Sequence, residues 1–297
     1  MLSNPRIPYR MAPWGGTPAA PVLPPLRGKR LIVQLVVNIE HWQFDQPMPR
    51  TVLTPPHGRD QVPDVPNFSW AEYGMRCGMP RLFRLFERHG VPASASFNAG
   101  VIEAYPECSE AVLRAGWEFI GHGLHQKAMH GEGDEAGLIQ ASLDRIERFS
   151  GQRPRGWLSP GLRESAVGAD LLHAAGIDYV FDWVLDDMPC WMRTTTGPML
   201  AMPYTLELND SVIYAVERHA TGELLSRFNR TLACLEEEFE AGPRILTLGL
   251  HPHLIGVPHR IGELKAILET LLARDDTVFV QPGEIAAWFT GACPAEA

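Results

Sequence analysis

The sequence predicts an α/β fold in which parallel strands are joined by about seven helical crossovers. Three observations predict it. Residues 31–40, LIVQLVVNIE, form a continuous apolar run, typical of a parallel strand covered on both faces. Apolar runs and helical periods then alternate to the C-terminus. Polar residues follow the runs where each strand would end, and in a parallel barrel these ends surround the active site.

The alternation can be followed element by element. Helices are expected over 71–89, 108–116, 134–149, 167–175, 222–242 and 263–274, and in a terminal helix around Ala286 and Trp288. Strands are expected over 31–40, 91–98, 117–123, 155–161, 179–184, 197–204, 244–253 and 277–282, with a further local strand over 211–216. Residues 43–68 have no helical period, and so long a loop in a compact domain is unusual unless it covers a site.

Composition narrows the class of protein. The proline-rich residues 1–29 predict an extended arm on the body or on a partner subunit, followed by one catalytic domain over 30–297. The net charge of −9 argues against a nucleic-acid or anionic-membrane surface, and no apolar run approaches the length of a membrane span. Five cysteines without CxxC spacing favour a reducing compartment. We therefore expect a cytoplasmic protein with a small-molecule substrate, assembled as a dimer or tetramer.

Glu40 is the strongest catalytic candidate, because it follows a buried strand at its carboxyl end. Poor solvation there raises the pKa of a carboxylate toward the range of a general base. The same group could equally ligate a metal or accept a hydrogen bond from a neighbouring backbone amide. Its neighbours Asn38 and Trp42 are expected to contact the substrate, Trp42 at the start of the covering segment.

Histidines follow two further strands. His122 lies between two glycines, with His125 close enough in sequence to share a metal. His251 ends another strand, with His253 two residues further on. A histidine there suits general acid chemistry or oxyanion stabilisation, because its ordinary pKa lies near neutrality. We expect His122 and His251 to be functional, and leave His125, His130 and His253 open.

The remaining strand ends carry polar groups that we expect to bind substrate: Asn98, Ser159, Arg163 and Asp182. Either Arg155 or Arg163 could hold a carboxylate. The sequence has no P-loop, no GxGxxG after a strand and no GxSxG elbow, so nucleotide and serine-hydrolase chemistry lack their usual motifs.

Several segments occur in an order that resembles the polysaccharide deacetylase (NodB-homology) family over roughly residues 31–290. They are VNIEHW, GWEFIGHGLH, RPRGWLSPG and LTLGLHPHLIG. LDDMPCWM and MPYTLELND further resemble its branch of PuuE-type allantoinases and cyclic imide hydrolases. The resemblance implies a distorted (β/α)7-type barrel and hydrolysis of a C–N amide bond.

The resemblance leaves the metal open. Metal-dependent members hold a divalent ion with one aspartate and two histidines that are four residues apart. Here Gln126 stands four residues after His122, and Glu40 and His41 stand where deacetylases have paired aspartates. Either no metal is bound, as the allantoinase branch implies, or an ion such as zinc is held by a rearranged set, such as Glu40 or His41 together with His122 and His125.

Both possibilities lead to one mechanism. We expect Glu40 to activate water for the opening of a small cyclic imide or ureide. His122 would position that water or ligate a metal, and His251 would serve as the acid or the oxyanion donor. An imide or ureide nitrogen leaves more readily than an amine, so the loss of a metal is compatible with such a substrate. The alternatives are a metal-dependent N-deacetylase of amino sugars or peptidoglycan, and a catalytically silent ligand-binding member of the fold.

Overall fold

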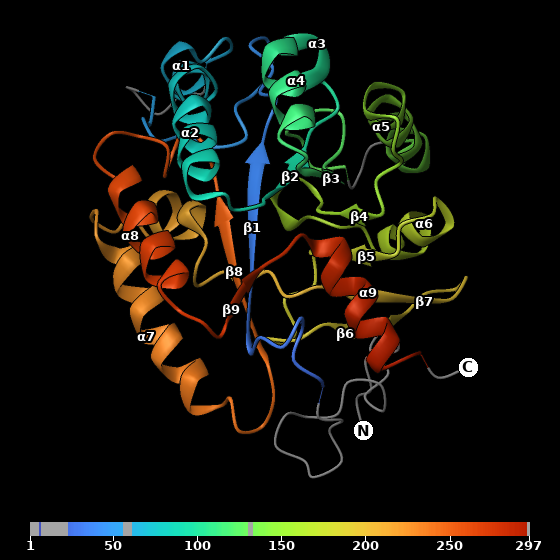
Figure 1. Ribbon diagram of the computed structural model, residues 1–297. Helices are drawn as coiled ribbons and strands as arrows, with labels where there is room; N and C mark the ends of the chain where they lie inside the picture. The colour runs from blue at the N-terminus through green and yellow to red at the C-terminus, as the bar shows by residue number, and fades with distance from the viewer. Residues whose placement is uncertain (1–5, 7–22, 56–60, 130–132, 296–297) are drawn as a thin grey trace.

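A computed structural model describes residue 6 and residues 23–55, 61–129 and 133–295. These residues form one nine-stranded sheet in the order β6–β7–β5–β4–β3–β2–β1–β8, with β9 also paired to β1 (Figure 1). The strands are β1 (Leu31–Ile39), β2 (Ser94–Phe97), β3 (Glu118–Gly121), β4 (Gly156–Trp157), β5 (Tyr179–Val180), β6 (Cys190–Arg193), β7 (Pro198–Ala201), β8 (Arg244–Leu250) and β9 (Thr277–Phe279). From β7 to β8 each neighbouring pair is parallel, which confirms the expected curled α/β sheet of the barrel type. The antiparallel edge strand β6 was not predicted.

Helices cover the sheet on both sides. They are α1 (Val65–Tyr73), α2 (Met79–His89), α3 (Val101–Ala104), α4 (Pro106–Arg114), α5 (Glu135–Ser150), α6 (Gly168–Ala174), α7 (Glu223–Glu237), α8 (Ile261–Leu272) and α9 (Pro282–Ala292). Local signals set several ends: the Asp134 side chain caps the start of α5, and Gly90 ends α2 in the left-handed conformation. A short 3-10 helix, Pro160–Leu162, follows β4.

Two expected elements were wrong in detail. The helix predicted over 71–89 is interrupted by a π-helix, Gly74–Gly78, between α1 and α2. A Cβ atom on Gly74 would lie 2.5 Å from the His253 backbone nitrogen, so the missing side chain lets this turn approach the chain after β8. The strand predicted over 211–216 is a second π-helix, Ser211–Val216. Single turns of this kind are common at functional sites, and the second one supplies Ser211 and Val212 to the wall of the cavity described below.

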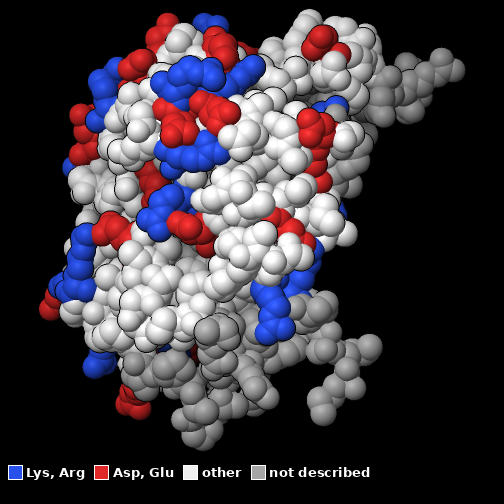
Figure 2. Space-filling view, turned by 90° about the vertical axis from the view of Figure 1, so that its right-hand side faces the viewer, with Lys and Arg blue, Asp and Glu red and all other residues white. Residues whose placement is uncertain are grey.

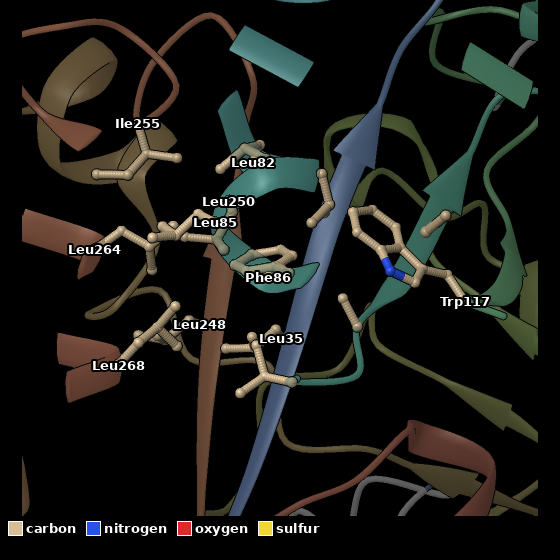
Figure 3. Packing of buried hydrophobic residues seen from close by; sticks show 14 of the residues in the cluster. Leu35, Leu82, Leu85, Phe86, Trp117, Leu248, Leu250, Ile255, Leu264 and Leu268 are labelled. Atoms are coloured by element: carbon tan, nitrogen blue, oxygen red, sulfur yellow. The ribbon is translucent and has the colours of Figure 1, made fainter. Parts of the chain in front are cut away.

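The alternating side chains of β1 divide the core in two. The odd-numbered residues from Leu31 to Ile39 pack under α2, α7 and α8, and Figure 3 shows Leu35 beside Leu85 and Phe86. Burial of one such side chain contributes about 1.5–3 kcal/mol to stability. The even-numbered Ile32 and Val36 belong to a second cluster with β7 and α9. The strand is therefore covered on both faces, as its unbroken apolar run predicts.

Two even-numbered residues of β1, Gln34 and Asn38, are polar and also buried. Alternation along an extended chain places Glu40 on their face and His41 on the opposite face. The polar groups after β1 are thus separated by the pleat, although they are adjacent in sequence.

The arm predicted at 1–29 lies mostly outside the described residues, and the division into arm and catalytic domain stays a prediction. Of its described part, Leu23 is buried and the Pro24 carbonyl accepts a hydrogen bond from Trp288. On the face seen in Figure 2, positive and negative side chains are interspersed. Among the described residues, no helix has the length and apolarity needed to cross a bilayer.

Candidate functional site

A cavity of about 500 Å³ lies at the carboxyl ends of the strands, beside β1, β3, β4 and β8. The arrowheads of β1 and β8 mark this edge of the sheet in the upper part of Figure 1. Its wall includes the following predicted site residues: Asn38, Glu40, Trp42, His122, Ser159, Arg163 and His251. The segment 43–68, expected to cover a site, supplies Pro47, Pro49 and Arg50 to the same wall.

Glu40 is held on one wall of this cavity with its side chain only 8% exposed. The Trp42 indole nitrogen donates a hydrogen bond to Glu40 Oε2 over 2.7 Å, and Oε1 lies 3.6 Å from His251 Nε2. Burial raises the pKa of Glu40, against the opposing effects of His251, the Trp42 hydrogen bond and Arg50. A carboxylate in this state is a stronger base than an exposed one.

His251 is oriented by Asp210, which was not among the site residues expected from the sequence. Asp210 Oδ1 lies 2.6 Å from His251 Nδ1, and Oδ2 accepts from the backbone nitrogens of His251 and Ile255. Burial opposes the charged imidazole, but the carboxylates of Asp210 and Glu40 outweigh it, so the pKa of His251 is raised. The His251 imidazole therefore lies between the carboxylates of Asp210 and Glu40, and both favour its protonated form.

His122 faces the same cavity in the opposite protonation state. Its Nδ1 contacts the Leu158 carbonyl, which can only accept, so Nδ1 carries the proton and Nε2 is an acceptor. Burial lowers the pKa of His122 to about 4, and the charge of His251 adds to this effect. The Gln126 side chain contacts His122 and opposes this lowering, and apart from that contact neither His122 Nε2 nor Gln126 Oε1 has a hydrogen-bond partner within the described part of the chain. The cavity thus presents two buried acceptors that a ligand or water can satisfy.

An aromatic wall closes the side toward α1. The His253 ring packs edge-on against Trp42 and Trp70, with ring centroids 5.5 Å and 4.6 Å apart. Burial lowers the pKa of His253 well below its ordinary value. His253 is therefore a neutral part of the wall.

His41 and His125 lie together but away from the cavity wall. Their Nδ1 atoms are 2.9 Å apart, and the His41 ring lies edge-on to Tyr105. The pleat of β1 explains the placement of His41, since it points to the face opposite Glu40. His130 lies outside the described residues.

The predicted metal set does not assemble. His122 faces the cavity, whereas His41 and His125 pair with each other elsewhere. Among the described residues, no group of three or more His, Cys, Asp or Glu side chains is placed to hold a metal ion. Gln126 supplies an amide where a second histidine would complete the familiar pair. The residues present therefore do not fit the metal centre of the metal-dependent deacetylases that the chain resembles.

The other strand-end predictions separate into two groups. Asn98 and Asp182 do not line the cavity: Asn98 Oδ1 accepts from the His41 backbone nitrogen, and its amide nitrogen donates to the His122 carbonyl. The Asp182 carboxylate accepts hydrogen bonds from the backbone nitrogen of Ser159, at 2.7 Å, and from its hydroxyl, at 2.8 Å. Ser159 lines the cavity, but its hydroxyl proton is committed to this contact. Asn98 and Asp182 thus position strand ends rather than substrate.

The two arginines differ in place. Arg163 is exposed and lies at the cavity wall. Arg155 pairs with Asp178 outside the cavity.

Several residues at the cavity were not expected from the sequence: Arg50, Gln126, Tyr204, Asn209 and Asp210. Only the segment MPYTLELND, singled out for its resemblance, contained a signal for the last three.

The chain is similar to known deacetylases in sequence. A family model described as "Polysaccharide deacetylase" matches residues 70–180, which include His122. A putative polysaccharide deacetylase of Schizosaccharomyces pombe is 27% identical over 237 residues, covering 73% of this chain and 74% of that protein. A peptidoglycan deacetylase of Helicobacter pylori is 26% identical over 157 residues, covering 52% of this chain and 53% of that protein.

Solved structures extend the likeness to nearly the whole chain. A probable polysaccharide deacetylase of Pseudomonas aeruginosa PAO1 has a TM-score of 0.82 at 26% identity, covering 95% of this chain and 98% of that one. The structure of Puue allantoinase has a TM-score of 0.83 at 24% identity, covering 95% and 97%, a likeness of fold. The chain is therefore similar to polysaccharide deacetylases in sequence, through the family model over residues 70–180, and shares their fold over nearly its whole length.

Proposed function

We propose that this hydrolase opens a small cyclic imide or ureide by cleaving one ring C–N amide bond. One observation carries the proposal: a buried carboxylate and a buried, carboxylate-oriented histidine lie 3.6 Å apart on the wall of one small cavity. The allantoinase that shares the fold over 95% of this chain supports the same substrate class.

The size and covering of the cavity favour a small ring over a polymer. A volume of about 500 Å³ is within the range of small-molecule sites. Trp42 and the prolines of the covering segment close the wall beside Glu40. A covered site excludes bulk water and keeps the charges of Glu40 and His251 effective at short range.

Proton transfer follows from the two raised pKa values. Glu40 removes a proton from the attacking water, whose oxygen bonds to the carbonyl carbon. The second proton of that water is held by His122 Nε2, a buried acceptor that among the described residues otherwise meets only the Gln126 side chain. When the C–N bond breaks, His251 delivers its Nε2 proton to the leaving nitrogen, while Asp210 stabilises the imidazolium before transfer.

The basicity of the leaving nitrogen determines how much acid or metal assistance the cleavage of the C–N bond requires. An imide or ureide nitrogen is conjugated to a second carbonyl, so it departs with less protonation than the amine of an N-acetyl sugar. Gln126 Oε1, the other buried acceptor, suits the N–H group that such rings carry. The site residues of this chain therefore match a ring amide without a metal-assisted step.

A second candidate is N-deacetylation of amino sugars or peptidoglycan. The similarity to the peptidoglycan deacetylase of Helicobacter pylori favours it, although that match covers about half of either chain. This reaction would use the same Glu40 and His251 but requires an open approach for a polymer.

Turnover of a defined panel separates the candidates. Purified protein is assayed on succinimide, glutarimide, dihydrouracil, hydantoin, allantoin and an N-acetylglucosamine oligomer, with metal content measured in the same preparation. Opening of at least one ring is the expected result. Cleavage of the oligomer alone would establish the deacetylase instead, and inactivity on all six would overturn both.

A further inference from the structure

Tyr204 lines the cavity, and its hydroxyl group accepts hydrogen bonds without donating one to any described residue. The residue follows β7, its ring is buried, and it packs edge-on against Phe181 with ring centroids 5.7 Å apart. Its oxygen receives hydrogen bonds from Asn38 Nδ2 at 2.9 Å and from Asn209 Nδ2 at 3.3 Å. Among the described residues, no acceptor receives the Tyr204 hydroxyl proton.

Backbone groups fix the direction of both amides. Asn38 Nδ2 also donates to the Leu250 carbonyl at 3.3 Å, and a carbonyl can only accept, so the nitrogen must face this side. Asn209 Oδ1 accepts from the Ser211 backbone nitrogen at 2.9 Å, so its nitrogen must face Tyr204. Tyr204 is therefore the acceptor in both contacts, and its own proton points in a third direction.

The close packing around this oxygen leaves little freedom for another arrangement. A Cβ atom on Gly249 of β8 would lie 2.8 Å from the Tyr204 hydroxyl and 2.9 Å from Asn209 Nδ2. Burial raises the pKa of Tyr204, and the carboxylates of Asp210 and Glu40 add to the shift, so the hydroxyl keeps its proton. The cavity thus contains an oriented neutral donor on the same wall as Glu40 and His251.

We infer that the Tyr204 hydroxyl donates a hydrogen bond to the carbonyl oxygen of the amide bond that is cleaved. This inference rests on the proposed function and adds the oxyanion donor that Glu40 and His251 leave unassigned. As the water oxygen bonds to the carbonyl carbon, the carbonyl π electrons move to oxygen. Tyr204 stabilises that negative charge without giving up its proton. Glu40 holds the proton taken from water, and the nitrogen receives the proton of His251 when the C–N bond breaks.

The test compares Tyr204→Phe with the unchanged enzyme on two substrates. One is the ring of the panel that is opened fastest, and the other carries sulfur in place of the cleaved carbonyl oxygen. Loss of one oxyanion donor lowers kcat by about 10²–10³-fold. Because sulfur accepts hydrogen bonds poorly, we expect the variant to lose at least tenfold less on the thiocarbonyl ring. Equal losses on both substrates, or no loss on the oxygen substrate, would overturn the inference.

Two further variants separate this role from a structural one. Tyr214→Phe removes a buried hydroxyl that donates to Glu263 away from the cavity, and should leave kcat unchanged. Asn209→Ala keeps the hydroxyl but frees one of its lone pairs, so we expect a smaller loss with the same dependence on sulfur. This variant serves the test even if Tyr204→Phe folds poorly.

Failure of the proposed function gives a different result. If the unchanged enzyme opens no ring but cleaves the N-acetylglucosamine oligomer, the proposed substrate class fails. The same comparison is then made with that oligomer and its N-thioacetyl analogue, because every amide hydrolysis passes through an oxyanion. If no substrate of either kind is cleaved, the inference fails together with the proposed function.

Discussion

Two buried histidines on different sides of the cavity, His251 after β8 and His122 after β3, are held in opposite protonation states. On the β8 side, His251 Nδ1 meets the Asp210 carboxylate. On the β3 side, His122 Nδ1 meets the Leu158 carbonyl. Both rings are deeply buried, so desolvation alone would lower both pKa values. The net charge of the partner therefore decides which histidine can act as an acid and which is a fixed acceptor.

The comparison extends to two buried aspartates. Asp210 accepts from two backbone nitrogens, and its Oδ1 also contacts an imidazole that it helps to charge. Asp182 receives only neutral donors from Ser159, and burial raises its pKa to about 7. The neighbouring Glu164 carboxylate adds to this rise, and no imidazole contacts Asp182 among the described residues. A buried carboxylate at a strand end can therefore hold a proton on a histidine only where it contacts an imidazole.

Glu40→Gln should have the largest effect, since it removes the base and half of the Glu40–His251 contact. We expect kcat to fall by about 10²–10⁴-fold, the usual range for a general base. The measurement is steady-state turnover of the best ring substrate. Glu118→Gln is a matched control, because Glu118 is also a buried glutamate but accepts from Tyr179 and Gly283 away from the cavity. Similar losses in both variants would contradict a specific role for Glu40.

Asp210→Asn should remove the difference between the two histidines. The asparagine can still accept from backbone, but it no longer stabilises an imidazolium, so the pKa of His251 should fall. We expect kcat to drop by about 10²–10⁴-fold, as when a histidine loses its orienting carboxylate. Histidine NMR titration checks the shift directly. An unchanged His251 titration would show that Glu40 rather than Asp210 maintains the charge.

The pH dependence should sharpen the same contrast. Glu40 acts when deprotonated and its pKa is raised, so kcat/KM should rise as pH increases through a value above the ordinary glutamate pKa of about 4.3. His251 acts when protonated and its pKa is also raised, so kcat/KM should fall as pH increases through a value above about 6.5. A pH–rate profile with no alkaline limb would contradict the acid role of His251.

His122→Asn tests the β3 side. Asparagine can keep the donor to the Leu158 carbonyl while it removes the Nε2 acceptor. We expect kcat to fall by about 10–100-fold, in proportion to one lost hydrogen bond of about 1.4–3 kcal/mol in the transition state. Both limbs of the pH–rate profile should stay in place, because His122 with its pKa near 4 is neutral throughout. A displaced limb would assign the titration to His122 and break the comparison.

Asp182→Asn should have the smallest effect on kcat and act on stability. A raised carboxyl pKa in the folded state stabilises the protein below the unfolded pKa, and this stability is lost as pH rises toward about 7. The free energy of unfolding of the unchanged protein, relative to the variant, should therefore decrease between about pH 4 and 7, by at most about 1.4 kcal/mol per pH unit. Denaturant unfolding across this range checks the slope, and a parallel pair of curves would refute it.

Local sequence pattern was sufficient to predict the fold and to point to some of the residues that line the candidate site. The apolar run of β1 and the alternating helical periods predicted a parallel sheet, and strand-end polarity selected Glu40, His122 and His251. These features depend on near neighbours in sequence, since periodicity and burial are properties of one element. Two details were wrong, and both involve contacts with the chain after β8. At 74–78, Gly74 and Gly78 pack closely against His253 and Pro252. At 211–216, Tyr214 contacts Glu263 and Arg260.

Only the tertiary structure decided how those candidates divide. The pleat turned His41 away from Glu40, and hydrogen bonds to the backbone and to Ser159 occupied Asn98 and Asp182. Asp210 and Tyr204 came to the cavity from segments far from His251 and Asn38 in sequence. The sequence determined which residue types stand at the strand ends. Their pKa values and free hydrogen-bonding capacity depend on partners distant in the chain, which only the folded arrangement brings into contact.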